Sequence, residues 1–378
     1  MFNYGKQYID QDDILAVSKS LKAKYLTGGL YVDKLEKQVS KKFKCKYAIA
    51  CNSGTSGIHL ALTSINLKKG DNVIIPAINF VAAANVCKLK GANIYFADVD
   101  QDTFQVGKQE IIQCIKKNNL KSIKVIFTMH LGGGAIHQSD IFKLKKRYNF
   151  ILIEDACHAL GAKYLNTNKY VGSGIYSDFT IFSLHPVKSM TSGEGGLICL
   201  NNRSNYIKIL SARSHGITNR KNYTYEINQS SLNFRCSDIN CSLAISQLKK
   251  LDKMILKRRR IANRYQNNLK QSQSDFEIVN SSYTNNSACH LLIIKFKFND
   301  SKLNLNKIFI KLKKKKIFTQ QHYTPTYRFL AFKGLVKKYN DFPHSEDYNL
   351  SCLSLPIYYS LSIKNVDKIC KEINKIFI

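Results

Sequence analysis

The chain has 378 residues, 44% of them hydrophobic and 22% charged, which is typical of a globular protein with a large core and two or three domains. No apolar run is long enough to span a membrane, and the N-terminus lacks the apolar core of a signal peptide. The net charge of +32 comes from lysines scattered along the sequence without a nucleic-acid motif, so we expect neither a nucleic acid nor a membrane as partner.

The first 30 residues predict a short arm and a helix. From about residue 45, apolar runs rich in Val, Ile and Leu alternate with helical segments, which is typical of a mainly parallel sheet covered on both faces. Helices are expected after residue 56 to about residue 67, and at 80–90, 107–118 and 138–148. The predicted strands are 47–51, 73–75, 94–96, 125–127, 151–153, 179–182 and 197–200.

A basic helical stretch at 238–268 predicts a connector that leaves this large domain. Beyond it, an apolar run at 290–294 predicts a strand, and 304–315 and 364–377 predict helices. We therefore expect an α/β fold with three parts. These are an N-terminal arm and helix (1–30), a large domain (31–250), and a connecting helix with a small α+β C-terminal domain (251–378).

The eleven cysteines are an odd number, and the nearest pair, Cys236 and Cys241, lacks the spacing of a zinc site. They indicate free, mostly buried thiols in a reducing compartment. We expect a cytoplasmic protein without a metal site.

Lys188 stands in a loop between two predicted buried strands, followed by several small residues and glycines up to Gly196. Most lysines lie on solvated faces. A lysine that reacts with an aldehyde instead needs a rigid mount and a lowered pKa, and this loop would provide both.

Two polar segments precede this loop, each at the end of an apolar run. Glu154 and Asp155 follow the run 151–153, at the strand end where open α/β sheets bind ligands, although an isolated Asp there could equally bind a metal or cap a helix. The segment 52–57 (NSGTSG) lies at a strand-to-helix junction, where backbone N–H groups and hydroxyls bind anions, or simply cap the helix.

Anion site, acid and lysine follow one another in the order found in fold-type I enzymes that use pyridoxal phosphate (PLP). Over nearly its full length the chain resembles the DegT/DnrJ/StrS family of nucleotide-sugar aminotransferases. The resemblance implies the type I PLP-dependent transferase fold, PLP as cofactor and transfer of an amino group to a sugar. Six segments carry it: 53–56, 79–85, 154–161, 183–196, 233–238 and 247–251.

The resemblance also implies the catalytic residues. Lys188 matches the lysine that binds the cofactor covalently, and Asp155 matches the acid that pairs with its ring nitrogen. Phe80 matches an aromatic residue stacked on the ring, although it could be an ordinary core residue. His158 matches a residue near the ring oxygen; otherwise it is a hydrogen-bonded helix histidine.

Gly54, Thr55 and Ser183 match residues that contact the cofactor phosphate. Asn233 matches an asparagine that reaches the phosphate of the neighbouring subunit's cofactor. This match implies a homodimer with shared active sites.

Within the family, segments 158–161, 213–216 and 322–327 resemble the subgroup of the pseudaminic acid pathway. This implies a UDP-linked 4-keto-6-deoxy sugar as substrate and L-glutamate as amino donor. For Tyr4 the alternative is a loose terminal residue, and for His322 and Tyr323 a place in the core. The implied substrate-binding residues are Tyr4, Lys24, Tyr25, Leu26, Thr27, His322, Tyr323, Thr324 and Pro325.

Two other functions stay open. The substrate could be another nucleotide-linked 4-keto sugar, of the perosamine or bacillosamine type. The chain could also be a non-catalytic regulator with a PLP fold. The segment 131–135 (LGGGA) is richer in glycine than the usual family loop, so we expect a different pocket wall there.

Overall fold

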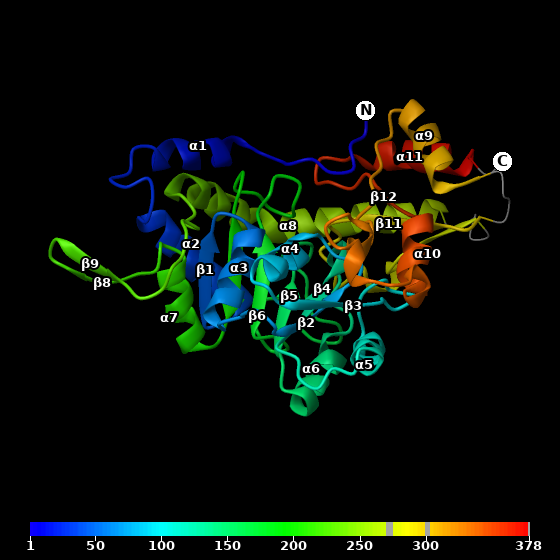
Figure 1. Cartoon of the computed structure of the whole chain (residues 1–378). Coiled ribbons are helices and arrows are strands. Elements are labelled where there is room, and N and C mark those ends of the chain that lie inside the picture. The colour runs from blue at the N-terminus through cyan, green and yellow to red at the C-terminus, as the bar shows by residue number, and fades with distance from the viewer. Residues whose placement is uncertain (270–274, 299–302, 377–378) are drawn as a thin grey trace.

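The computed structural model describes residues 1–269, 275–298 and 303–376. Its centre is a seven-stranded sheet with the order β1-β7-β6-β5-β4-β2-β3 (Figure 1). β7 is antiparallel to both of its neighbours, and all other adjacent strands are parallel. The predicted α/β fold with a mainly parallel sheet is therefore confirmed. The strands are β1 (Tyr47–Cys51), β2 (Asn72–Pro76), β3 (Asn93–Ala97), β4 (Val125–Met129), β5 (Ile151–Asp155), β6 (Phe179–Ser183) and β7 (Gly196–Leu200).

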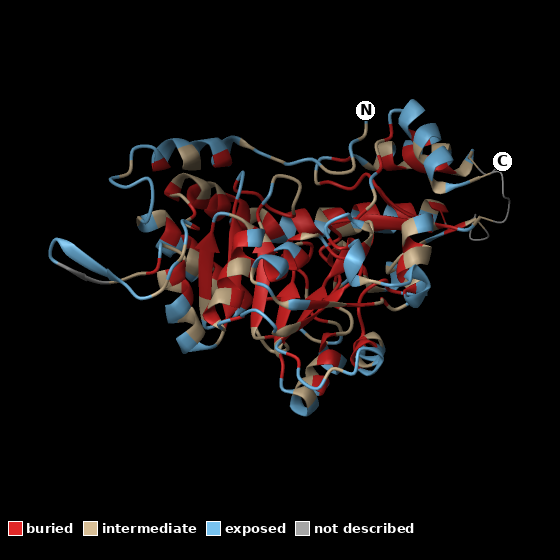
Figure 2. Ribbon diagram, in the orientation of Figure 1, coloured by how far each residue is buried: buried red, intermediate tan, exposed pale blue. Residues whose placement is uncertain are grey.

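Helices cover both faces of this sheet, and its strands are almost entirely buried (Figure 2). Alternate residues of a strand face opposite sides. In β1, Ile49 therefore joins the core under α3, α4 and α7, whereas Ala48 joins the core under α2 and α8. A third core lies under α5 and α6. The helices are α2 (Leu30–Phe43), α3 (Gly54–Ser64), α4 (Ala82–Leu89), α5 (Lys108–Lys117), α6 (Gln138–Tyr148), α7 (Arg203–Ala212) and α8 (Asp238–Leu269).

The long helix α8 belongs to two cores. Its first part, up to Ile255, packs in the core with α2, and its last part, from Ile261, packs in the core of the C-terminal region. The latter contains an antiparallel sheet of β10 (Phe276–Ile278), β11 (Leu292–Phe296) and β12 (Cys352–Leu355). Its helices are α9 (Leu305–Lys314), α10 (Pro343–Ser351) and α11 (Ile363–Asn374). The domain limit at residue 250 stays a prediction.

The N-terminal arm crosses the C-terminal region before α1 (Gln11–Ser20) packs on α8. Phe2 forms a bridge with Ile317, and the carbonyl of Tyr4 accepts a hydrogen bond from Ile357. The arm thereby places Tyr4 beside the sheet edge that bears the polar segments described above.

Some predicted boundaries differ from the structure. The helix expected from Phe80 begins at Ala82, because Val81 forms the turn that precedes it. The strand expected at 290–294 is β11 (Leu292–Phe296), because residues 288–291 bond instead to the loop at Gly132 and Gly133. The last helix was expected at 364–377 and is α11 (Ile363–Asn374); residue 377 lies outside the described residues.

Several elements were not predicted: α2, α7, α10, β10, β12 and a hairpin of β8 (Ile217–Lys221) and β9 (Thr224–Ile227) that extends from the body (Figure 1). Within the described ranges, no helix is both long and apolar enough to cross a bilayer. All eleven cysteines are free.

Candidate active site

Sheet register brings the predicted polar segments to one edge. Gly196, the first residue of β7, pairs with Cys51 at the end of β1 and with Ser183 at the end of β6. Asp155, at the end of the parallel strand β5, pairs with Ile181. The loop that follows β1, the end of β5 and the loop between β6 and β7 therefore surround one cavity of about 330 Å³.

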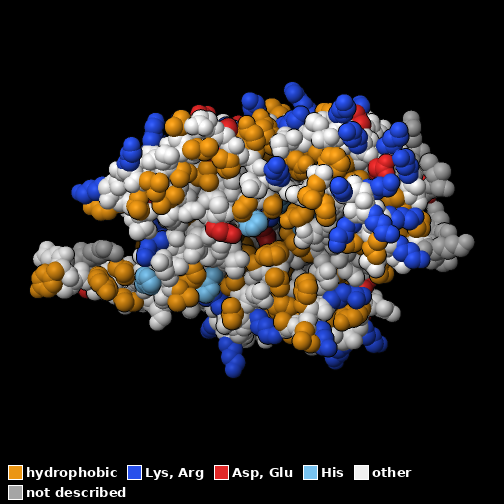
Figure 3. All heavy atoms as spheres, turned by 90° about the horizontal axis from the view of Figure 1, so that it is seen from above, with side chains coloured by type: hydrophobic (Ala, Val, Ile, Leu, Met, Phe, Trp, Pro, Cys, Tyr) orange, Lys and Arg blue, Asp and Glu red, His pale blue; other side chains and the backbone are white. Residues whose placement is uncertain are grey.

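The face shown in Figure 3 carries Lys and Arg side chains mainly around its periphery. Near its middle, hydrophobic, acidic and histidine side chains surround a hollow. Fixed positive charge is thus more abundant at the rim of this face than at its centre.

The segment expected to bind an anion lies at the beginning of α3, on one wall of the cavity. Ser53 caps this helix, and its hydroxyl accepts a hydrogen bond from the Ser56 N–H at 3.0 Å. The N–H groups of Gly54 and Thr55 belong to the first turn, where helices leave donors for an anion. A Cβ atom on Gly54 would lie 3.2 Å from both the Cys157 sulfur and the Ser183 Cβ, so this wall is tightly packed.

Lys188 lies in the loop between β6 and β7, which hydrogen bonds close at its base. Leu184 donates to the Gly195 carbonyl at 2.9 Å, and Ser192 donates to the Leu184 carbonyl at 3.0 Å. Burial lowers the pKa of Lys188 from its ordinary value, although Cys157 and Asp155 oppose this effect. A lowered pKa increases the fraction of Lys188 that is present as the neutral, nucleophilic amine.

The two carboxylates at the end of β5 point to opposite sides of the sheet. Asp155 lines the cavity, and its Oδ1 accepts a hydrogen bond from the Cys157 N–H at 3.1 Å. Glu154 is fully buried, and its Oε2 accepts hydrogen bonds from three hydroxyl groups. They belong to Tyr164, Ser177 and Thr180, at 2.8, 3.0 and 2.8 Å. Only Asp155 is therefore available to a ligand in the cavity.

Aromatic residues form the opposite wall. Phe80 lines the cavity and is 49% exposed, so it is accessible to a ligand there. Its ring lies 5.5 Å from that of Tyr323, whose hydroxyl is 2.9 Å from Nε2 of His158. His158 does not itself line the cavity and lies behind Tyr323 and His290. Burial lowers the pKa of His158 well below its ordinary value.

The predicted substrate residues separate into two groups. Tyr4, His322 and Tyr323 line the cavity, and the rings of Tyr4 and His322 are 5.0 Å apart. Burial lowers the pKa of His322 to about 3. Thr324 and Pro325 follow this wall without lining the cavity.

Residues 24–27 lie outside this cavity of the single chain, in the connection between α1 and α2. Leu26 accepts a hydrogen bond from the Asp238 N–H at 2.9 Å, and Thr27 pairs with Ser237. Asn233 is also exposed and outside the cavity, and its carbonyl accepts a hydrogen bond from Asn52. The roles of all these residues stay predictions.

Some cavity residues were not predicted from the sequence. Cys157 could have been found, because it stands two positions after Asp155 at the same strand end. No local pattern marks His290 or Gln320, which reach the cavity from the C-terminal region. The others are Ile58, Ala82, Met129, His185, Val187 and Glu194.

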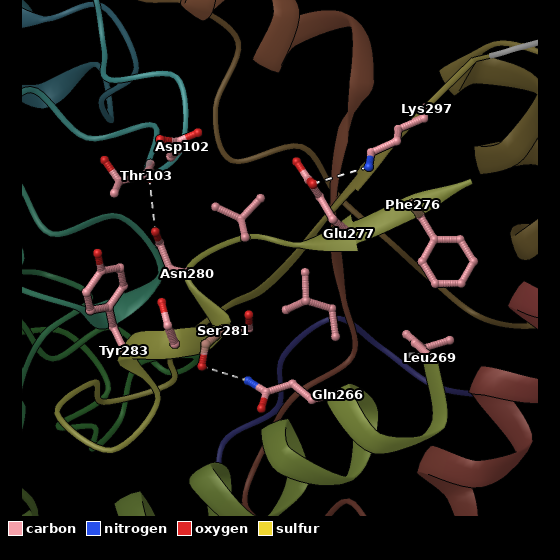
Figure 4. Close-up of a pocket in the computed structure, with 13 residues that line it drawn as sticks. Asp102, Thr103, Gln266, Leu269, Phe276, Glu277, Asn280, Ser281, Tyr283 and Lys297 are labelled. Carbon is pink, nitrogen blue, oxygen red and sulfur yellow. Dashed lines mark hydrogen bonds and ion pairs between the residues drawn. The ribbon is translucent and has the colours of Figure 1, made fainter. Parts of the chain in front are cut away.

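A second cavity, of about 530 Å³, lies between the end of α8, β10 and the loop that follows β10 (Figure 4). Three of its polar side chains pair with neighbouring protein groups: Gln266 with the Ser281 carbonyl, Asn280 with the Thr103 carbonyl, and Glu277 with Lys297. None of the predicted site residues lines it. Its volume alone does not make it the reactive site.

A model of the DegT/DnrJ/EryC1/StrS aminotransferase family matches residues 7–374. The chain belongs to this family. A UDP-4-amino-4,6-dideoxy-N-acetyl-beta-L-altrosamine transaminase from Campylobacter jejuni subsp. jejuni serotype O:23/36 is 34% identical over 365 residues, which cover 97% of this chain and 94% of the relative. The predicted enzyme class, a sugar-nucleotide aminotransferase, is thereby confirmed.

Two solved structures agree with this assignment. Helicobacter pylori PseC, an aminotransferase involved in the biosynthesis of pseudaminic acid, has a TM-score of 0.91 and 27% identity, with 100% of this chain and 99% of PseC covered. Streptococcus pneumoniae Spr1654, solved in PLP and PMP forms, has a TM-score of 0.90 and 26% identity for the PLP form, with 99% and 97% covered. The aminotransferases of this family depend on PLP, as predicted.

The residues around the cavity fit this cofactor. The first turn of α3 offers N–H groups to a phosphate, and Asp155 offers a carboxylate to a protonated ring nitrogen. Phe80 offers a flat apolar surface to the ring. Lys188 lies on the same cavity, with the lowered pKa that a covalent bond to an aldehyde requires.

Proposed function

We propose that the protein transfers an amino group from L-glutamate to the 4-keto carbon of a UDP-linked 4-keto-6-deoxy sugar, in the pseudaminic acid pathway. The products are the UDP-linked 4-amino sugar and 2-oxoglutarate. The observation that carries the proposal is the joining of Lys188, Asp155 and the anion site at α3 around one cavity. The choice of sugar is supported by the transaminase from C. jejuni and by PseC from H. pylori.

The bound cofactor supplies an aldehyde that accepts the amino group and a ring that withdraws electrons from the reacting carbon. Lys188 holds the cofactor covalently between turnovers, and its free Nζ moves the proton to and from the reacting carbon. Asp155 keeps the proton on the ring nitrogen. Tyr4, His322 and Tyr323 line the side of the cavity from which we propose the sugar enters.

We also propose a cytoplasmic homodimer with shared active sites. Asn233 is exposed and outside its own chain's cavity, which suits a contact with the partner's cofactor phosphate. Exposed apolar side chains lie in the same region of the chain, among them Tyr25, Leu26, Leu30 and Leu232. Such side chains suit a contact with a second copy.

The test is incubation of the purified protein with L-glutamate and a panel of UDP-, dTDP- and GDP-linked 4-keto-6-deoxy sugars. The readouts are 2-oxoglutarate release and the mass of the sugar product. We expect the highest kcat/KM for the UDP-linked L-sugar of the pseudaminic acid type. Preferred turnover of a perosamine-type or bacillosamine-type precursor would overturn the choice of sugar. Absence of amino transfer to any sugar would favour the alternative that the protein is a non-catalytic regulator with a PLP fold.

A further inference from the structure

A small cavity, the arm cavity, lies between the N-terminal arm, the loop that carries Lys188 and the helix α8. Its volume of about 10 Å³ admits one ligand about as large as a water molecule. Lys188 is the only described residue that lines both the arm cavity and the larger cavity at the sheet edge. A ligand in the arm cavity would therefore lie beside this lysine.

Arg258 of α8 lines the arm cavity and is buried, with 2% of the residue exposed. Its Nη1 donates to the carbonyls of Ile357, His290 and Cys289, at 3.0, 3.4 and 3.5 Å. Nε is buried without a hydrogen-bond partner among the described residues, and Nη2 has no hydrogen bond to them either. The Nε–Nη2 edge, which presents two parallel N–H donors to an anion, is therefore unpaired within the described chain.

The charge of Arg258 also has no counterion within the described ranges. No carboxylate there pairs with the guanidinium, and no acidic residue lines the arm cavity, to which Lys6 and Lys188 add positive charge. Burial lowers the pKa of Arg258 to about 10, so the guanidinium keeps its proton at neutral pH. A buried charge is unfavourable unless an opposite charge pairs with it. A water molecule would satisfy only the N–H groups, whereas a bound anion would also neutralise the charge.

The N-terminal arm forms one wall of this cavity and is held in place by the rest of the chain. Gln247 of α8 donates a hydrogen bond to the Tyr8 carbonyl at 3.0 Å. A Cβ atom on Gly5 would lie 3.3 Å from the Cβ of Val187, so the arm and the lysine loop are in close contact. Lys6 is exposed, and exposed side chains change rotamer freely, so this wall can accommodate an ion slightly larger than water.

We propose that the arm cavity binds a small monovalent inorganic anion, of about the size of chloride, on the Nε–Nη2 edge of Arg258 and beside Lys188. The cavity is too small for glutamate or a diphosphate, so this anion is a constituent of the protein and not a substrate. Its negative charge favours the protonated form of the group at Lys188. This effect rests on the proposed function, in which Lys188 holds the cofactor, whereas binding of the anion does not.

The first experiment measures binding directly, in crystals of the protein soaked with sodium bromide, because bromide replaces chloride and scatters X-rays anomalously. We expect an anomalous peak in the arm cavity, in contact with the guanidinium of Arg258. A cavity without a peak, a cavity that holds only water, or bromide confined to surface lysines would overturn the proposal. No cofactor chemistry enters this measurement, so its outcome is independent of the proposed function.

The second experiment follows the midpoint pH at which the visible absorbance of the bound cofactor changes. Chloride replaces gluconate, an anion too large for the cavity, at constant ionic strength. We expect the midpoint to rise by about 0.5 to 1 pH unit with a saturable dependence on chloride, because a nearby anion favours the protonated form. Bromide in the cavity together with an unresponsive midpoint would overturn the effect on Lys188. The spectrum of Lys188→Ala separates that outcome from failure of the proposed function.

Arg258→Gln is the decisive variant, because it removes both the charge and the Nε–Nη2 edge. It should raise the chloride concentration that half-saturates the midpoint shift more than about tenfold, because charge-assisted hydrogen bonds are lost. Arg259→Gln is the matched control, because Arg259 is the next residue of α8, donates to the Ser287 carbonyl at 2.8 Å and does not line the cavity. It should respond to chloride as the wild type does.

If Arg258→Gln does not fold, Ser189→Ala takes its place, because Ser189 is buried, lines the arm cavity and carries a hydroxyl that can donate to the anion. It should weaken chloride binding about two- to tenfold. Half-saturation at the wild-type chloride concentration in the variant used would overturn the site. Equal losses in Arg258→Gln and Arg259→Gln would overturn it as well, because the response would then come from the general charge of α8.

Discussion

Lys188 is partly buried at the cavity, a position that is costly for most lysines. Burial disfavours the ammonium form and lowers the pKa of this lysine. The neutral amine that results is the form that attacks an aldehyde or takes up a proton. The same environment would only destabilise a lysine without such a task.

Replacing Lys188 by alanine is expected to lower kcat by about 10²- to 10⁴-fold or more, because the group that moves the proton is lost. The visible band of the covalently held cofactor should vanish in the absorption spectrum. Lys143→Ala on α6, whose side chain is exposed and pairs with Asp140, should leave both unchanged. A Lys188→Ala protein with the wild-type spectrum would contradict the assignment.

Substitutions of the two neighbouring carboxylates at the end of β5 should have opposite effects on PLP binding and on stability. Asp155→Asn is expected to weaken PLP binding and activity with little loss of stability, because Asp155 faces the cavity. Glu154→Gln is expected to lower the free energy of unfolding by about 1–3 kcal/mol, because three buried hydroxyls lose a charged acceptor. Chemical unfolding and PLP titration of both variants measure this difference. Loss of stability in Asp155→Asn together with loss of PLP binding in Glu154→Gln would contradict it.

At the scale of elements, β1, β5 and β6 end at the same edge because of the parallel pairing and the return of the chain through β7. Short apolar runs made these strands predictable, since a strand buried on both faces carries no regular alternation. The hairpin of β8 and β9 was not predictable in this way. Tyr225 and Ile227 alternate with Thr224 and Glu226, but all four residues are exposed, so the hairpin is not a strand pair of the core.

The loop after β4 supplies a test at this scale. Gly133 has a positive φ, and a Cβ there would meet the His158 carbonyl at 2.8 Å. Gly133→Ala should therefore lower the free energy of unfolding by about 1–3 kcal/mol or more. Gly134 is the matched control, because its φ is −96° and a Cβ there meets nothing closer than 3.7 Å. Equal stability of the two variants in urea unfolding would contradict the close contact between Gly133 and the His158 carbonyl.

For the molecule as a whole, the sequence predicted the contributions of the large domain to the cavity better than those of the C-terminal region. Asp155 stands at a strand end and Lys188 in the loop between two strands, where local pattern is sufficient. His290 and Gln320 reach the cavity through tertiary contacts, which no local pattern encodes. Residues 24–27 and Asn233 lie outside the cavity of one chain, so their predicted roles depend on a second copy.

The buried histidines predict how the stability of the whole molecule depends on pH. The pKa of His322 is lowered to about 3, and those of His158 and His290 lie well below the ordinary value. The unfolded chain therefore binds more protons than the folded one below about pH 6.5. The contribution of these histidines to the free energy of unfolding is fully present above that pH. It falls as the pH drops towards 3, by up to about 1.4 kcal/mol per pH unit for each histidine.

Urea unfolding at pH 7.5 and pH 5 measures this loss. His322→Asn should reduce the difference between the two conditions, whereas His215→Asn, at an exposed histidine, should leave it unchanged. A protein that is equally stable or more stable at pH 5 would contradict neutral burial of these rings.

The central claim is that this cavity moves an amino group by way of a cofactor held on Lys188. The most direct measurement is the visible spectrum of the purified protein with PLP, first with L-glutamate and then with the UDP-linked 4-keto sugar. We predict that glutamate removes the visible band, that the sugar restores it, and that Lys188→Ala shows neither change. A band that persists in excess glutamate, or the same response in the Lys188→Ala variant, would contradict the claim.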